Sequence, residues 1–291
     1  MKIYALNFLK DETIEEYAKI LDQLKKDGIP TIEPVKGIDG RFLQKFTHKN
    51  IVYQSSLSQF VELSEFSENY LNKSVAEELA TTLSKLHSSL NKIAASKNTR
   101  TLKPIETLNS LLTDEVLTKI KEYFKENIER QERLNKYLEK YLHDGNNLLN
   151  YFQERKEMLK KQELIHGDFQ LTNLNIHDGK IKTIFDFDEM TLAPISFEIG
   201  CSITHLDEGF MLTDDLIEVF IKKYKEFKNL SKQDIKDIIM FMQYRCFYRI
   251  SRWFTYYRFS TNAVEHFSKY QYKLDRYKQL NIDELTKFIE E

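Results

Sequence analysis

The chain has only two cysteines among its 291 residues, Cys201 and Cys246. Two cysteines so far apart provide neither a disulfide framework nor a cluster of thiolate metal ligands, and they are typical of a reducing compartment. The sequence also lacks a run of eighteen apolar residues and a basic leader followed by an apolar segment. These absences argue against a membrane span and against secretion. We therefore predict a cytoplasmic protein.

An excess of charge of one sign is also missing. Lysine and arginine together number 43 and aspartate and glutamate 45, so the formal net charge is −2. A chain without a global basic field is not expected to attract nucleic acid or an anionic membrane. We predict neither as a partner, and the composition leaves the oligomeric state open.

Glycine and proline are scarce, with eight and four residues, which favours long helices. From about Val75 onward, apolar residues recur at helical spacing, as in the stretch from Ala76 to Leu90. The amino-terminal part differs, with one helix predicted over Thr13 to Lys26 and ended by Gly28-Ile29-Pro30. Strands are predicted at Lys2–Phe8, Arg41–Phe46 and Asn50–Tyr53. The fold class is therefore α+β, with a small mixed unit followed by a helical part.

The segment from Leu164 to Asn173 carries the strongest chemical signal. Asp168 follows an apolar pair that can fix its backbone, and it is placed to accept a proton from a hydroxyl group. Asn173, five residues later, offers a neutral amide oxygen, which is a hard ligand for Mg²⁺. Phosphoryl transfer needs this kind of set, because it depends mainly on the placement of a nucleophile, a triphosphate and metal ions.

A predicted hairpin brings a second metal ligand to the same place. Asp178-Gly179 is a dipeptide favoured in two-residue turns, and it is flanked by two alternating segments. The hairpin returns the chain to its starting point, so that Asp186 is expected beside Asn173. A carboxylate and an amide oxygen would then converge on one cation.

These residues resemble the aminoglycoside phosphotransferase and choline kinase superfamily, with its His-Gly-Asp-x-x-x-x-Asn loop and a following Asp-Phe-Asp or similar segment. The resemblance implies that Asp168 is the catalytic base, that Asn173 and Asp186 bind Mg²⁺ and the nucleotide, and that His166 is a structural residue of the loop. It also implies ATP and Mg²⁺ as cofactors and a small molecule as the partner. Asp188 and Glu189 fit either a solvated surface or the acceptor site.

The amino-terminal part departs from the family pattern. Related kinases begin with two strands and a glycine-rich loop, followed by a strand with a Lys or Arg that pairs with a helix Glu. In this sequence Asn7 aligns near the basic position and Lys19 near the Glu, so both members of the ion pair look changed. Lys10 or Lys2 is a candidate for the missing charge. The loop is either lost or lies upstream of a sequence that starts late.

The acceptor site is expected in the carboxy-terminal part. Arg245, Arg249 and Arg252 share one helix face and are suited either to an anionic group of a substrate or to acids of neighbouring helices. Nearby aromatic residues are expected in the core, and the alternative is a cage for a quaternary amine. Asp188, Glu189, Asp207 and Glu208 are candidates for a cationic acceptor. Homoserine, choline, ethanolamine, a methylthio-sugar and an aminoglycoside all remain possible substrates.

We therefore expect a two-lobed protein-kinase-like fold, with a shortened nucleotide-binding lobe over residues 1–60 and a helical lobe over 61–291. The expected activity is ATP-dependent transfer of the γ-phosphoryl group to a hydroxyl of an amino-alcohol, a sugar or an aminoglycoside. The alternative is a pseudokinase-like module that binds a nucleotide or ligand without catalysis. A protein-directed kinase is disfavoured because the sequence has no His-Arg-Asp, Asp-Phe-Gly or Ala-Pro-Glu segment.

Overall fold

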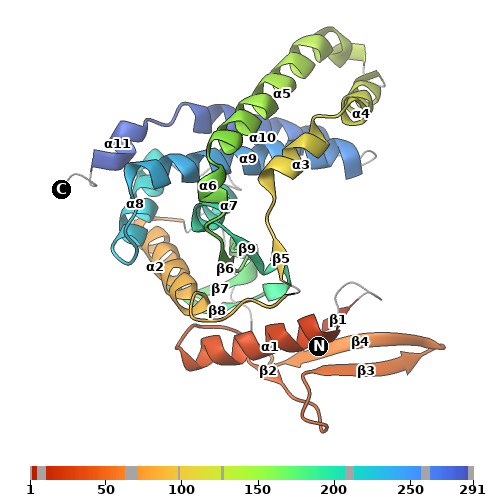
Figure 1. The fold of residues 1–291 in the computed structure, drawn as a ribbon, viewed down its shortest axis with the longest axis vertical. Coiled ribbons are helices and arrows are strands. Elements are labelled where there is room, and N and C mark those ends of the chain that lie inside the picture. The colour runs from red at the N-terminus through yellow and green to blue at the C-terminus, as the bar shows by residue number, and fades with distance from the viewer. Residues whose placement is uncertain are drawn as a thin grey trace. The chain divides into compact units, whose positions relative to one another are not determined.

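The computed structural model describes residues 2–4, 11–62, 71–97, 99–125, 128–206, 213–256 and 263–287 (Figure 1). The chain divides into two units. The first comprises Met1–Thr101, Glu163–Leu192 and His205–Asn229, and the second comprises Leu102–Gln162, Ala193–Thr204 and Leu230–Glu291. In the part of the chain that the structure describes, no helix is both long enough and apolar enough to cross a membrane.

The amino-terminal sheet of the first unit is built around one long strand. Strand β4 (Ile51–Ser58) pairs antiparallel with β1 (Lys2–Tyr4), β2 (Pro34–Val35) and β3 (Leu43–His48). Lys49 and Asn50 both have positive φ and form the turn between β3 and β4. The predicted strand start at Asn50 is therefore one residue early, because Asn tolerates the left-handed conformation of this turn. Residues 5–8 of the first predicted strand lie outside the described residues.

Helix α1 (Asp11–Lys26) follows the predicted helix closely. Acids in its first turn and lysines in its last turn complement the helix dipole. Gly28 then takes a positive φ of 79°, and the Ile29 N–H donates to the Leu24 carbonyl oxygen at 2.9 Å. This backbone pattern ends the helix at the predicted place, because glycine adopts the left-handed conformation without steric cost.

The remainder of the first unit contains residues 163–192, which include the predicted catalytic loop and hairpin and are called the catalytic segment below. Strands β5 (Arg100–Thr101), β9 (Thr191–Ala193) and β6 (Glu163–Ile165) form a three-stranded sheet in that order. Strands β7 (Leu174–His177) and β8 (Lys180–Ile184) form an antiparallel hairpin. Two helices, α2 (Lys73–Leu90) and α8 (Asp214–Lys225), are joined by a buried hydrogen bond of 2.6 Å between His87 Nδ1 and the Tyr224 hydroxyl.

The second unit is helical. Its elements are α3 (Pro104–Leu111), α4 (Asp114–Lys125), α5 (Ile128–Glu154), α6 (Lys156–Leu159), most of α7 (Ile195–Leu206), α9 (Lys232–Tyr256), α10 (Ala263–Lys278) and α11 (Ile282–Thr286). Phe152 of α5 packs against Phe241 and Tyr244 of α9. Phe197 of α7 also packs against Phe241. Aromatic residues of α9 therefore contribute to the core.

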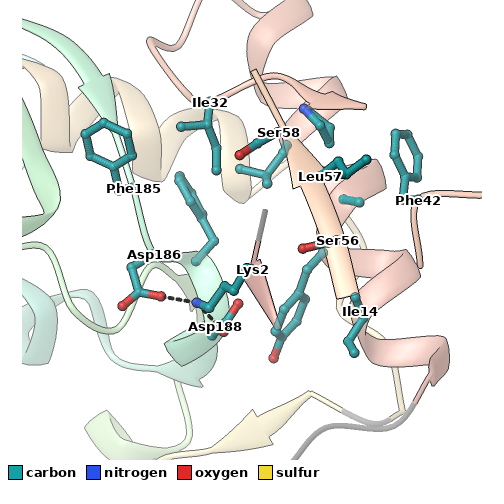
Figure 2. A pocket seen from close by; sticks show the side chains of 15 residues that line it. Lys2, Ile14, Ile32, Phe42, Ser56, Leu57, Ser58, Phe185, Asp186 and Asp188 are labelled. Carbon is teal, nitrogen blue, oxygen red and sulfur yellow. Dashed lines mark hydrogen bonds and ion pairs between the residues drawn. The ribbon is translucent and has the colours of Figure 1, made fainter. Parts of the chain in front are cut away.

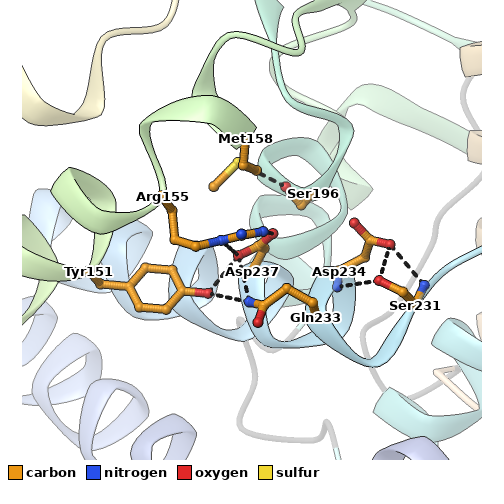
Figure 3. Close-up of polar contacts among 8 residues, drawn as sticks. All are labelled: Tyr151, Arg155, Met158, Ser196, Ser231, Gln233, Asp234 and Asp237. Carbon is orange, nitrogen blue, oxygen red and sulfur yellow. Dashed lines mark hydrogen bonds and ion pairs between the residues drawn. The ribbon is translucent and has the colours of Figure 1, made fainter.

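A buried ion pair joins the end of α5 to α9 (Figure 3). The Arg155 guanidinium donates two hydrogen bonds to the Asp237 carboxylate, at 3.1 and 2.7 Å, and the Tyr151 hydroxyl donates a third at 2.5 Å. Asp237 is fully buried. The hydrogen bonds from Arg155 to Asp237 are the main reason that the pKa of Arg155 lies above its ordinary value. The pair satisfies a carboxylate that would otherwise be costly to bury.

Candidate active site

His166 organises the loop that carries Asp168. It follows the buried strand β6 and is itself fully buried. The Asp168 N–H donates to His166 Nδ1 at 3.2 Å, so the proton of the ring lies on Nε2, which donates to the Phe185 carbonyl oxygen at 2.8 Å. His166 thereby connects the loop to Phe185, the residue before Asp186, and each ring nitrogen forms a hydrogen bond with a backbone group.

Gly167 is required by the same loop. Its φ is 85°, and a Cβ atom at this position would lie 2.1 Å from the Glu189 carbonyl oxygen. A side chain therefore meets both an unfavourable backbone conformation and a backbone atom. The close approach brings the Asp168 loop against the segment that follows Asp186.

The Asp168 carboxylate is held by two amide side chains. Its Oδ2 accepts hydrogen bonds from Gln170 Nε2 at 2.7 Å and from Asn173 Nδ2 at 2.8 Å. His205 Nε2 lies 3.9 Å from Oδ1. The interpretation of the sequence missed Gln170 and His205. Gln170 had a signal in its position inside the loop motif, whereas His205 is 37 residues from Asp168 and no local pattern marks it.

The hairpin brings Asp186 next to Asn173, as the turn signal predicted. Asp178 and Gly179 both have positive φ, and the Phe185 N–H donates to the Asn173 carbonyl oxygen at 2.8 Å. Asp186 itself has φ 59° and ψ 60°. A left-handed conformation at a residue other than glycine is strained, and such strain is concentrated at functional positions.

Lys2 of β1 lies against this segment from the amino-terminal sheet (Figure 2). Its Nζ is 2.7 Å from Asp186 Oδ1 and 2.5 Å from Asp188 Oδ2. Burial lowers the pKa of Lys2, but its hydrogen bonds to the two carboxylates outweigh burial, and the net pKa is raised. Of the two lysines considered for the missing charge, Lys2 is thus at the site. Lys10 and Asn7 lie outside the described residues.

A cavity of about 280 Å³ opens beside Lys2 (Figure 2). Apolar side chains form most of its wall: Ile14, Ala18, Leu21, Ile32, Phe42 and Leu57. At one end the lining becomes charged, with Lys2, Asp186 and Asp188. The cavity therefore combines an apolar chamber with one end that contains an ammonium group and two carboxylates.

The residues proposed for a metal suit Mg²⁺ chemically. Asn173 uses its amide nitrogen for Asp168, at the carboxylate and at the carbonyl oxygen, which leaves the amide oxygen as the atom to face a cation. Asp186 supplies a carboxylate that already holds a cationic ammonium group. Both donors are the hard oxygen ligands that Mg²⁺ requires. Within the described ranges, no group of three or more His, Cys, Asp or Glu side chains is arranged to hold a metal.

The other candidate residues have varied surroundings. Glu189 pairs with Arg100 at 3.1 Å, while Asp207 and Glu208 lie outside the described residues. In the second unit, Arg252 donates to the Tyr248 hydroxyl at 3.2 Å. Arg249 Nε is buried and has no hydrogen-bond partner among the residues that the structure describes.

Comparison with known proteins identifies a family. Residues 1–225 match the phosphotransferase enzyme family. No curated protein is similar enough to the chain to count as a match.

Solved structures share the fold at low sequence identity. An amicoumacin kinase in complex with AMP-PNP, Ca²⁺ and its ligand is 14% identical with a TM-score of 0.72, covering 98% of this chain and 84% of that one. An aminoglycoside phosphotransferase from Alicyclobacillus acidocaldarius is 12% identical with a TM-score of 0.72, covering 97% and 85%. A microcompartment-associated aminopropanol kinase is 14% identical with a TM-score of 0.69, covering 95% and 84%. The predicted kinase-like α+β fold is confirmed.

Proposed function

Because the chain belongs to the phosphotransferase enzyme family, whose members are small-molecule kinases, we propose that it transfers the γ-phosphoryl group of ATP to a hydroxyl of an amino-alcohol, a sugar or an aminoglycoside. The observation that carries the proposal is the arrangement of Asp168, Asn173 and Asp186 around one hairpin. A base beside two oxygen ligands for a metal corresponds to the base and the metal-binding groups that recur in phosphoryl-transfer enzymes.

ATP is proposed to occupy the cavity beside Lys2. The apolar wall suits a nucleobase, and the charged end suits the phosphates and their metal. A solved relative with the same fold is a complex with AMP-PNP, and a spectinomycin phosphotransferase with a TM-score of 0.57 is a complex with ADP. Both support nucleotide binding by this chain.

Each residue of the loop has a proposed role. Asp168 would orient the acceptor hydroxyl and accept its proton, and Gln170 and Asn173 fix the carboxylate for this task. The Asn173 amide oxygen and the Asp186 carboxylate would hold Mg²⁺, which neutralises charge on the phosphates when bound. Lys2 would supply a further positive charge to the phosphates.

The proposal extends to the organisation of the chain. We assign residues 1–60 to a shortened nucleotide-binding lobe and residues 61–291 to the lobe that carries the catalytic loop and the substrate site.

A cytoplasmic location is also proposed. The two cysteines are buried and free, which supports a reducing compartment.

An acceptor screen tests the activity. Wild-type protein is incubated with Mg·ATP and one compound at a time from a panel of amino-alcohols, sugars and aminoglycosides, and release of ADP is followed. We expect acceptor-dependent ADP release that disappears in Asp168→Asn. Binding of the nucleotide without turnover on any acceptor would favour the non-catalytic module instead.

A further inference from the structure

The α1 residues that line the cavity beside Lys2 provide no counter-ion for its ammonium group. The α1 residues that line the cavity are Ile14, Tyr17, Ala18 and Leu21, and none carries a negative charge. Helix α1 buries apolar side chains instead, and the Tyr17 hydroxyl donates a hydrogen bond to the Met190 carbonyl oxygen at 3.4 Å. An ammonium group at the charged end of the cavity must therefore be balanced from another element.

Three acids of α1 line a different cavity. Asp11, Glu12 and Glu15 line a second, open cavity, together with Lys19. Glu15 Oε1 accepts the Leu43 N–H at 2.7 Å, and Asp11 pairs with Lys45 of β3. Lys19, expected near the position of a pairing acid, lies in this second cavity as well. Among the described residues that line the two cavities, the acids of α1 therefore lie in the second cavity and Lys2 lies in the first.

Asp188 is the less exposed of the two carboxylates that contact Lys2. Its side chain is 14% exposed, compared with 43% for Asp186. Its neighbour Phe187 is buried and packs on His166 at a centroid distance of 4.4 Å. On the other side, Arg100 donates to the Asp188 carbonyl oxygen at 2.5 Å. Asp188 is therefore fixed by the catalytic segment itself, and an ion pair with less solvent is less screened.

Asp186 and Asp188 differ in what else they must do. Asp186 is the proposed metal ligand, and an ammonium group on its Oδ1 competes with a cation for that oxygen. Asp188 has no such competing role in the proposed function. When Mg²⁺ binds, charge repulsion between the ion and the ammonium favours movement of Lys2 away from Asp186, while the contact with Asp188 can persist.

We propose that Asp188 is the residue that positions Lys2 for the nucleotide phosphates, in place of an acid on helix α1. Lys2 leaves Asp186 when the Mg·nucleotide binds and keeps its contact with Asp188. This inference rests on the proposed function, because it assumes a nucleotide in the cavity. Asp188 acts through Lys2 and touches neither the acceptor nor the transferred group.

Calorimetric binding of AMP-PNP and of adenosine, both in the presence of Mg²⁺, tests the inference. The proteins are wild type, Lys2→Met, Asp188→Asn and the double variant. We expect each single variant to bind AMP-PNP at least tenfold more weakly, because Lys2→Met removes the positive charge from the phosphates and Asp188→Asn removes the ion-pair partner that positions Lys2. The double variant should be no weaker than Lys2→Met. Adenosine affinity should stay within twofold in all four proteins, since adenosine has no phosphates.

Matched variants separate positioning from folding. Glu189→Gln changes the neighbouring acid and Glu15→Gln changes the acid of α1, and both should bind AMP-PNP like wild type. Asp188→Glu should recover part of the lost affinity. The inference is overturned if Asp188→Asn binds AMP-PNP like wild type, or if its effect adds fully to that of Lys2→Met. Failure of wild type to bind AMP-PNP would instead contradict the proposed function itself.

Discussion

Asn173 donates hydrogen bonds from its side-chain amide nitrogen to both the carboxylate and the carbonyl oxygen of Asp168, at 2.8 and 2.9 Å. The positions of the proposed metal ligand and the proposed base are therefore coupled through these hydrogen bonds. Any shift of Asn173 moves the carboxylate that must face the acceptor hydroxyl. This coupling gives a physical reason for the spacing from Asp168 to Asn173, because the Asn173 side chain both holds the proposed base and supplies a proposed metal ligand.

Replacement of the base should lower turnover strongly and leave nucleotide binding unchanged. Asp168→Asn keeps the size of the side chain but cannot accept the hydroxyl proton, so we expect kcat to fall by about 10²- to 10⁴-fold. AMP-PNP affinity, measured by calorimetry, should change less than twofold. Asp178→Asn, in the exposed hairpin turn, serves as the control with wild-type turnover. Wild-type kcat in Asp168→Asn would refute the assigned role.

Two glycines with positive φ should respond differently to alanine. Gly179→Ala meets no atom within 4 Å and should cost only the backbone term, about 1 kcal/mol. Gly167→Ala adds a clash with the Glu189 carbonyl oxygen, so its urea midpoint should fall further and its turnover should drop. Equal midpoints and equal activities for the two variants would show that the loop can move away from the segment after Asp186.

The Arg155–Asp237 pair should be important for stability. Arg155→Ala leaves a buried carboxylate without its cation, and we expect a loss of about 3 kcal/mol in the free energy of unfolding. Lys160→Ala removes an exposed lysine from its pair with Glu157 and should change stability by less than about 0.5 kcal/mol. Urea denaturation followed by circular dichroism measures both. Similar midpoints for the two variants would contradict the importance given to the buried pair.

Stability should decline in alkaline solution. Burial raises the pKa of Tyr141 and of Tyr244 above the ordinary value of about 10. Above pH ~10 the unfolded chain loses these protons while the folded protein keeps them, so stability that is fully present below pH ~10 is lost as the pH rises. Each group contributes about 1.4 kcal/mol per pH unit in that range. Urea midpoints at pH 8, 10 and 11 measure the slope. Tyr141→Phe should reduce it, and an unchanged slope would show that Tyr141 does not contribute.

Local signals made much of the site predictable. The turn at Asp178-Gly179 and the end of α1 at Gly28 depend on backbone conformations that few residues adopt, so the residues themselves mark the positions. The spacing from Asp168 to Asn173 is likewise local, because one loop contains both. These features follow from a few consecutive residues.

The contacts of Lys2 could not be predicted in this way. Lys2 meets Asp186 and Asp188 only because β1 pairs with β4 and brings the amino-terminal sheet to the catalytic segment. The alignment on Gly28-Ile29-Pro30 placed Asn7 and Lys19 at the ion-pair positions and left Lys2 only as one of two candidate lysines, with no predicted partner. The distance between His205 and Asp168 depends on tertiary packing in the same way. Ion pairs between residues far apart in sequence carry no periodic signal.

The hairpin and its loop are proposed to form a Mg²⁺-dependent nucleotide site. Calorimetric titration of wild-type protein with AMP-PNP, with and without Mg²⁺, tests it most directly, with Asp186→Asn as the matched variant. We predict binding that is strengthened by Mg²⁺ in wild type and is largely insensitive to Mg²⁺ in Asp186→Asn. Absence of AMP-PNP binding by wild type in the presence of Mg²⁺ would contradict the account.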